Sequence, residues 1–162
     1  MPSYTHLAYR RNAKAAARNQ QIKKPKNLTL LKKARDDFGF FCEYVADKPP
    51  ATHHQEWHRN FITNEDSSCL IKIAGPNVDL LAPRGSAKST VLGLLTAWAI
   101  GVHTQAGLPL QVLYLSYTVD IARSKSATIK RIIESKRFQE VFPKVRLLKN
   151  VTSNEYWSID HK

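Results

Sequence analysis

The sequence predicts an α/β fold with a parallel sheet, and two observations lead to that prediction. Residues 78–82 and 110–116 are short apolar runs of the kind that form buried strands. A helical pattern follows each run, over residues 88–101 after the first and from the helix-capping residue Thr118 after the second. Because strands and helices that alternate in this order form parallel sheets, we expect both runs to be strands of one such sheet.

Two further helices are expected before the sheet. Between residues 28 and 46 apolar side chains recur at three- and four-residue intervals, which predicts an amphipathic helix that ends at Pro49 and Pro50. A second, short helix is predicted over residues 53–63, with Trp57 buried. In the helix after Thr118, the positions predicted to face the core are Ile121, Ile129, Ile132 and Ile133.

The positive charge of the chain is concentrated at its N-terminus. Of the 25 Lys and Arg residues, ten lie in residues 1–35, which hold no Asp or Glu. The rest of the chain is nearly balanced, with fifteen basic and thirteen acidic residues. We therefore divide the chain into a basic, flexible arm over residues 1–35 and a folded part over residues 36–162. Such an arm either contacts nucleic acid or is a solvated tail, and charge alone does not separate the two.

Composition excludes several other classes of protein. No stretch approaches the roughly 18 apolar residues of a membrane span. The basic N-terminus has no apolar signal core, so secretion is not expected. Cys42 and Cys69 have neither metal-ligand nor redox spacing, and are expected to be reduced thiols of a cytosolic protein. His53, His54 and His58 are clustered without a zinc-protease pattern, and are expected to be ordinary surface histidines.

Residues 82–90, between the first predicted strand and its helix, carry the motif that points to chemistry. They read Ala-Pro-Arg-Gly-Ser-Ala-Lys-Ser-Thr, against the phosphate-binding pattern G-x-x-x-x-G-K-[ST]. Ala82 and Ala87 replace both glycines of that pattern, while Lys88, Ser89 and Thr90 are intact. The predicted strand before and helix after are the context in which such a match is credible. The alternative is a basic turn before a core helix.

Each loop position has a role in binding a nucleoside triphosphate. Gly85 permits backbone conformations closed to other residues, and the amides of residues 86–88 can point N–H groups at phosphate oxygens. Lys88 would neutralise the β- and γ-phosphates, and the Ser89 hydroxyl would bind Mg²⁺. Arg84 lies within the loop, where its guanidinium could stabilise charge on the γ-phosphate. The predicted cofactors are therefore ATP and Mg²⁺.

The loop resembles the deviant Walker A motif of the large terminase subunits of tailed bacteriophages, in which a basic residue occupies the early loop. Flanking segments are also similar to that family, over about residues 36 to 158. They are an aromatic stretch at residues 37–41, the His-Gln-Glu-Trp of residues 54–57, a second strand and helix at residues 113–126, and residues 138–143. The resemblance implies a P-loop ATPase with a parallel sheet, and gives Gln55 the contacts to the adenine edge.

The family also implies a biological role. Large terminase subunits hydrolyse ATP to package double-stranded DNA into procapsids, and they cut DNA concatemers. The resemblance therefore implies double-stranded DNA, a portal protein and a small terminase subunit as partners. It also implies assembly into a homo-oligomeric ring, in the cytoplasm of the infected host.

The sequence departs from the family after the loop. The family has a Walker B strand that ends in Asp, a catalytic Glu beside it, and a metal-dependent nuclease domain. Here only 74 residues follow Lys88, and the one late candidate, Asp160, is followed by His161 and is expected to be an ordinary strand residue. We therefore expect residues 36–162 to be the N-terminal portion of the ATPase domain, with a sheet incomplete at the C-terminus and no nuclease. Two alternatives stay open: a fragment of a helicase-like P-loop ATPase, and a non-enzymatic DNA-binding or motor-interfering protein.

Overall fold

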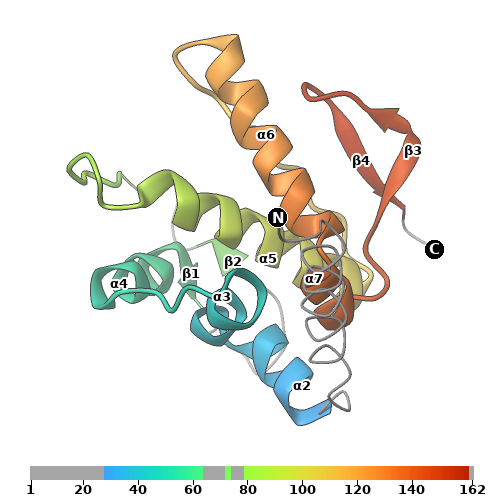
Figure 1. Ribbon diagram of the computed structural model, residues 1–162, viewed down its shortest axis with the longest axis horizontal. Coiled ribbons are helices and arrows are strands. Elements are labelled where there is room, and N and C mark those ends of the chain that lie inside the picture. Colours follow the sequence, from blue (N-terminus) through green and yellow to red (C-terminus); the bar gives the residue numbers. More distant parts are fainter. Residues whose placement is uncertain (1–27, 64–71, 74–78, 161–162) are drawn as a thin grey trace, which may run out of the picture.

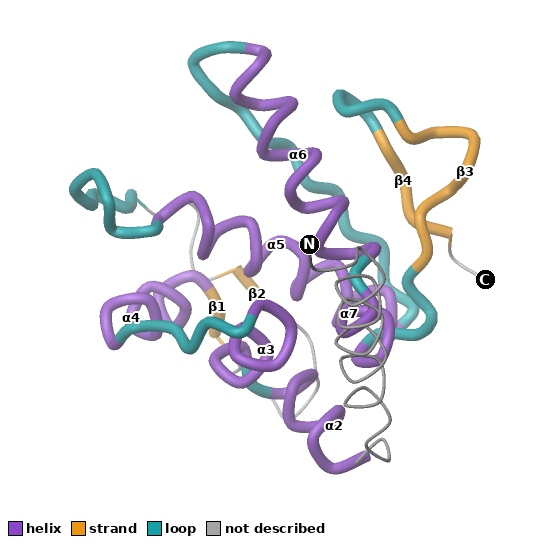
Figure 2. The backbone as a smooth tube through the Cα atoms, viewed as in Figure 1, coloured by secondary structure: helices purple, strands orange, loops and turns teal. Residues whose placement is uncertain are grey.

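The computed structural model describes residues 28–63, 72–73 and 79–160, and this part of the chain is mainly helical (Figure 1). Its helices are α2 (Leu28–Asp36), α3 (Phe38–Ala46), α4 (Thr52–Phe61), α5 (Lys88–Ala106), α6 (Val119–Glu134) and α7 (Lys136–Val141). Its strands are β1 (Ile62–Thr63), β2 (Lys72–Ile73), β3 (Arg146–Thr152) and β4 (Trp157–Asp160). They form two separate antiparallel pairs, β1 with β2 and β3 with β4 (Figure 2).

The predicted parallel sheet, and with it the P-loop NTPase fold, is wrong. Within the described residues no two strands pair in parallel, and residues 79–82 and 110–116 have no regular secondary structure. An apolar run becomes a strand only when a neighbouring strand accepts its backbone hydrogen bonds, and a short run does not reveal whether such a neighbour exists. Here the apolar side chains of both segments remain largely outside the core, with Leu81 96% and Leu113 82% exposed.

Helix α5 is the centre of the molecule. It crosses the middle of the assembly and contacts α2, α3 and α6 (Figure 1). Its residues are buried on almost every side, and the indole N–H of Trp98 donates a buried hydrogen bond of 3.2 Å to the carbonyl of Ala34 on α2. The helix ends at Gly107, whose φ of 73° is the left-handed conformation that favours glycine at this position. None of the described helices is both long and apolar enough to cross a membrane.

The predicted helix over residues 28–46 is two helices that meet at Asp37. This residue has an extended backbone, with φ −124° and ψ 114°, and its carboxylate accepts a 2.7 Å hydrogen bond from the N–H of Phe40. It therefore caps α3. The apolar spacing still identified the buried face, because Leu31 and Ala34 of α2 are in the core. Residues 28–35, the end of the predicted arm, thus belong to a packed helix.

An aromatic cluster joins α3 and α7 beneath α5. The ring of Phe41 lies 6.1 Å from those of Phe138 and Phe142, and the latter two are 5.2 Å apart, centroid to centroid. All three side chains are fully buried. Gly101 of α5 packs against this cluster, since a Cβ atom there would overlap the ring of Phe142. Size, as well as hydrophobicity, therefore decides which residue fits this point of α5.

Helix α6 follows the sequence prediction closely. The hydroxyl of Thr118 accepts a 3.4 Å hydrogen bond from the N–H of Ile121, so the predicted N-cap is confirmed. Ile129 and Ile133 are buried as predicted, whereas Ile121 is exposed. The β3–β4 hairpin lies beside α6, and the indole of Trp157 joins it to this helix by donating a 2.7 Å hydrogen bond to the hydroxyl of Ser126.

Candidate phosphate-binding site

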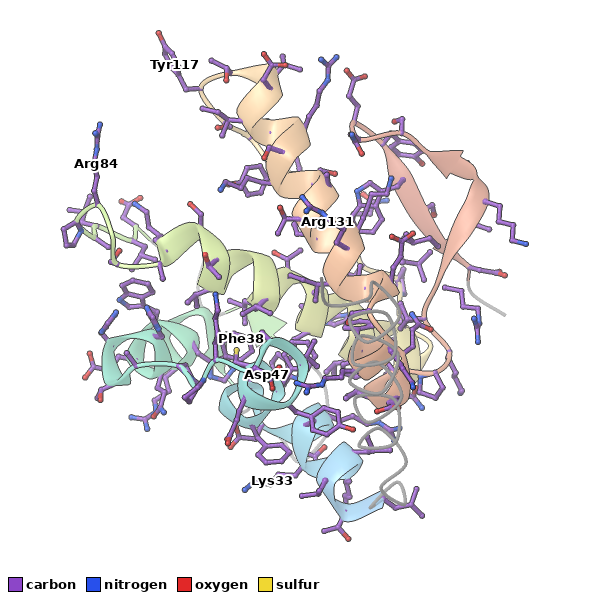
Figure 3. The ribbon with its side chains drawn as sticks, viewed as in Figure 1. Lys33, Phe38, Asp47, Arg84, Tyr117 and Arg131 are labelled. Carbon is purple, nitrogen blue, oxygen red and sulfur yellow. The ribbon has the colours of Figure 1, made fainter. Side chains whose placement is uncertain are left out.

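The 82–90 loop lies at the start of α5, away from the core of the molecule. Arg84 is at its tip, and its side chain points away from the body (Figure 3). Two loop residues have left-handed backbones, Gly85 with φ 87° and Ala87 with φ 56°. The chain therefore turns sharply twice before the helix begins.

The left-handed conformation of Ala87 is unusual, because an L-residue with a Cβ atom pays about 1–2 kcal/mol to adopt it. Ala87 occupies the position of the second glycine in the phosphate-binding pattern. Its carbonyl accepts hydrogen bonds from the N–H groups of Thr90 and Val91, at 2.9 and 3.0 Å, and so starts the helix. The N–H groups of Lys88 and Ser89 have no acceptor within the helix that they open. The loop thus makes a left-handed turn at this position with an alanine in place of the glycine of the pattern.

Ser86 leaves a further polar group without a partner. Its Oγ is buried, and in the described part of the chain it makes no hydrogen bond. A buried hydroxyl without a partner costs free energy unless a ligand or water completes it. The phosphate-binding capacity of the loop therefore rests on the N–H groups at the start of α5 and on the positive end of its helix dipole, because the Ser86 Oγ is closed to solvent in this conformation.

The side chain of His54 ties α4 to the loop. Its Nδ1 accepts a hydrogen bond from the N–H of Ala51 at 3.2 Å, so its Nε2 carries the hydrogen that is donated to the carbonyl of Ser86 at 2.9 Å. His54 therefore bridges two backbone segments, and the expectation of an ordinary surface histidine was wrong. The only feature of the sequence that pointed to His54 was its position next to Gln55 in the His-Gln-Glu-Trp segment.

Gln55, the residue expected to contact adenine, faces a different region. It lines a pocket of about 290 Å³ on the α3–α4 side, together with Asp36, Asp37, Phe38, Gly39, His58 and Arg59. Burial lowers the pKa of His58, and the Arg59 charge adds to this while Asp37 opposes it. None of the residues of the 82–90 loop lines that pocket. The structure thus brings α4 to the loop through His54, and not through Gln55.

A second pocket, of about 240 Å³, lies between the first turns of α5 and the middle of α6. Ser89 and Thr90 line it from the loop motif. Lys48 after α3, Tyr114 and the α6 residue Lys125 contribute polar groups that the sequence did not single out, and no Asp or Glu is among the lining residues. Their segments are distant in sequence, so no local pattern could have predicted this grouping.

The residues fit a metal only as part of a metal–nucleotide complex. In the part of the chain that the structure covers, no three His, Cys, Asp or Glu side chains form a group that could hold a metal ion. Mg²⁺ is usually bound by one or two carboxylates together with substrate phosphates, whereas Ser89 offers a hydroxyl alone, and the pocket that it lines has no Asp or Glu. Asp160 does not contribute, because it lies at the end of β4 opposite Arg146, on the other side of the molecule from the loop (Figure 1).

Cys42 is not a candidate nucleophile. It is a free thiol on α3, and burial raises its pKa to about 12, with a smaller contribution from Asp37. A thiol with such a pKa is almost never a thiolate near neutral pH. Cys69 lies outside the described residues.

Comparison with known protein families, curated proteins and solved structures finds no match to this chain.

Proposed function

We propose that the 82–90 loop binds Mg-ATP and that this chain is the ATP-binding portion of a phage terminase large subunit. The observation that carries the proposal is the left-handed turn at Gly85 and Ala87, directly before the Lys88-Ser89 pair at the start of α5. A phosphate cradle of this kind is local: it needs the turn, the helix and a lysine, and it does not depend on a parallel sheet.

In this proposal each loop residue contacts a different part of the triphosphate. The N–H groups of Ala87 and Lys88 would bind phosphate oxygens, while the N–H of Ser86 would first have to leave the carbonyl of Pro83, to which it donates a 3.4 Å hydrogen bond. Thr90 would follow in the first helical turn. Lys88 would neutralise the β- and γ-phosphates, while the Ser89 hydroxyl would hold Mg²⁺, which supplies charge neutralisation to the bound triphosphate. Arg84, exposed at the loop tip, would fold onto the γ-phosphate.

The wider role follows from the resemblance of the loop and its flanking segments. In the intact motor, ATP hydrolysis would drive double-stranded DNA into a procapsid in the host cytoplasm. The portal protein, the small terminase subunit and further copies of the large subunit would be its partners. Of the basic residues in the predicted arm, the seven in residues 1–27, which precede the packed helix α2, would contact DNA.

Titration calorimetry with Mg-ATP tests the proposal. Lys88→Ala should weaken binding by roughly 1.5–3 kcal/mol, the scale of a hydrogen bond to a charged group. Lys144→Ala is the matched control, because this exposed lysine lies after α7, outside the loop. Equal affinity of the wild type and Lys88→Ala would contradict the proposal, as would an equal loss in both variants.

A further inference from the structure

The pocket between α5 and α6, here called the α5–α6 pocket, has an apolar floor and a polar mouth. The two helices pack side by side. The lining residues are Ala46, Lys48, Ser89, Thr90, Gly93, Leu94, Tyr114, Lys125, Thr128, Ile129 and Ile132. The pocket volume of about 240 Å³ is somewhat below the range of drug-sized ligand sites. The pocket is therefore of a size for a ligand about as large as a nucleoside.

Gly93 keeps this pocket open. Glycine is a poor residue for a helix interior, and packing explains Gly101 of the same helix, where a Cβ atom would overlap Phe142. Packing does not explain Gly93, because a Cβ atom there would meet only Cγ1 of Ile129, at an ordinary contact distance of 3.9 Å. A larger side chain at residue 93 would instead fill the α5–α6 pocket, which Gly93 lines.

The lining residues favour a ligand that has a flat, largely apolar ring and an anionic group. The aliphatic side chains of Leu94, Ile129 and Ile132 offer a surface for a ring, and the hydroxyl groups around them offer hydrogen bonds. Lys48 and Lys125 supply two cations with no acidic residue in the lining, and neither forms an ion pair within the described residues. A nucleoside joined to phosphates has this combination of properties.

The position of the pocket relative to the loop connects the two. Ser89 and Thr90 line the pocket and directly follow Lys88 in the first turn of α5. We infer that the α5–α6 pocket receives the base and ribose of the nucleotide whose phosphates lie at the 82–90 loop. Tyr114 and Thr128 then supply polar contacts to the nucleoside, in place of Gln55, which lines the other pocket. This inference rests on the proposed function.

Parallel titrations with Mg-ATP and Mg-tripolyphosphate test the inference. Tripolyphosphate has the phosphates of ATP but no base or ribose. Gly93→Leu, which fills the pocket, should weaken Mg-ATP at least tenfold and leave Mg-tripolyphosphate unchanged, whereas Lys88→Ala should weaken both. Thr128→Phe blocks the mouth of the pocket from the exposed face of α6, and serves as a second variant if Gly93→Leu does not fold.

The outcomes separate this inference from the proposed function. If the wild type binds neither ligand, the proposed function fails. If Lys88→Ala weakens both ligands while Gly93→Leu and Thr128→Phe leave Mg-ATP unchanged, the proposed function stands and the pocket inference is overturned. Equal losses for both ligands in the pocket variants also overturn it. Photolabelling of the wild type with 8-azido-ATP should mark the peptide that holds Tyr114 or Thr128, and a label on α4 near Gln55 would contradict the inference.

Discussion

The ring of Phe142 fills the space into which a side chain at Gly101 would project. This relationship fixes the distance between α5 and the segment that follows α7, because both residues are buried in the aromatic cluster. The same contact makes Gly101 intolerant of substitution by alanine, although alanine is usually favoured over glycine in a helix.

Gly101→Ala should therefore destabilise the protein by about 1–3 kcal/mol, the usual cost of forcing extra atoms into a packed core. Gly93→Ala is the matched control on the same helix. It should raise the free energy of unfolding by about 0.5–1 kcal/mol, since its Cβ atom meets no closer contact than 3.9 Å. Chemical denaturation of both variants measures the difference. Changes of the same sign would contradict this packing of α5.

Ala87→Gly should stabilise the protein by up to about 1 kcal/mol. The substitution removes the cost of a left-handed alanine, and the greater chain entropy of glycine offsets part of that gain. Ala97→Gly makes the same chemical change in the buried, right-handed part of α5, where it should cost about 1 kcal/mol or more. Denaturation curves compare the two, and a loss of stability in Ala87→Gly would show that the loop does not hold this conformation in solution.

His54→Ala should loosen the 82–90 loop and weaken Mg-ATP a few-fold. The variant removes the hydrogen bond from Nε2 to the carbonyl of Ser86, and a typical bond of this kind contributes about 1 kcal/mol. Hydrogen exchange over residues 83–90 should become faster. His53→Ala is the control, because it also removes a ring that packs on Trp57 but breaks no bond to the loop. Equal exchange rates in the two variants would argue against a role for His54.

Stability should fall in mild acid because of His58. Burial holds its pKa below the usual value of 6.5, so the unfolded chain takes up a proton more readily than the folded one. The contribution of neutral His58 is therefore complete above about pH 6.5, and it is lost as the pH falls from there through the lowered pKa of the folded state. His58→Phe keeps a ring to stack on Phe38, 4.9 Å away, and should flatten this pH dependence.

Denaturation of the wild type and His58→Phe between pH 5 and pH 8 checks this, with His53→Gln as the control for loss of an exposed histidine. An unchanged pH profile in His58→Phe would assign the acid sensitivity to other groups.

Binding of double-stranded DNA should be non-specific and should fall steeply as salt increases. Residues 1–27 hold seven of the ten basic residues before Asp36, and deletion of these 27 residues should remove most of the affinity. The deletion stops there because residues 28–36 form α2, which packs in the core. Fluorescence anisotropy at several salt concentrations measures the effect, and unchanged Mg-ATP binding confirms that the deletion protein is folded. Full DNA affinity in the deletion protein would place the DNA site elsewhere.

Local signals in the sequence predicted the places of α2 to α6, but not all of their ends, and α7 was not predicted. The cap at Thr118 acts within one turn of a helix, so the sequence reveals it directly. The helix predicted over residues 88–101 instead continues to Ala106 and ends at Gly107. The break at Asp37 was also local, but the apolar spacing runs through it without interruption and concealed it. The parallel sheet failed for the opposite reason, because pairing between strands depends on segments far apart in the chain.

In the candidate site, too, local features could be predicted from the sequence, whereas contacts between distant segments could not. The loop, its lysine and Gly85 lie within nine consecutive residues and could be picked out from the sequence, whereas the left-handed turn at Ala87 was not predicted. The bridge from His54 to Ser86 spans 32 residues, and the α5–α6 pocket draws Lys48 and Lys125 from opposite sides of α5 in the sequence. Such contacts arise from packing, which no spacing rule over a single segment can express.

A practical consequence of α5 concerns genetic screens for loss of nucleotide binding. The same helix begins at the 82–90 loop and carries Trp98 and Gly101 through the core three turns later. A substitution at either core residue would disturb the helix that presents Lys88, and in a screen it would be indistinguishable from a lesion in the loop itself. Only a separate measurement of folding for each variant distinguishes residues that would contact the phosphates from those that hold the helix in place.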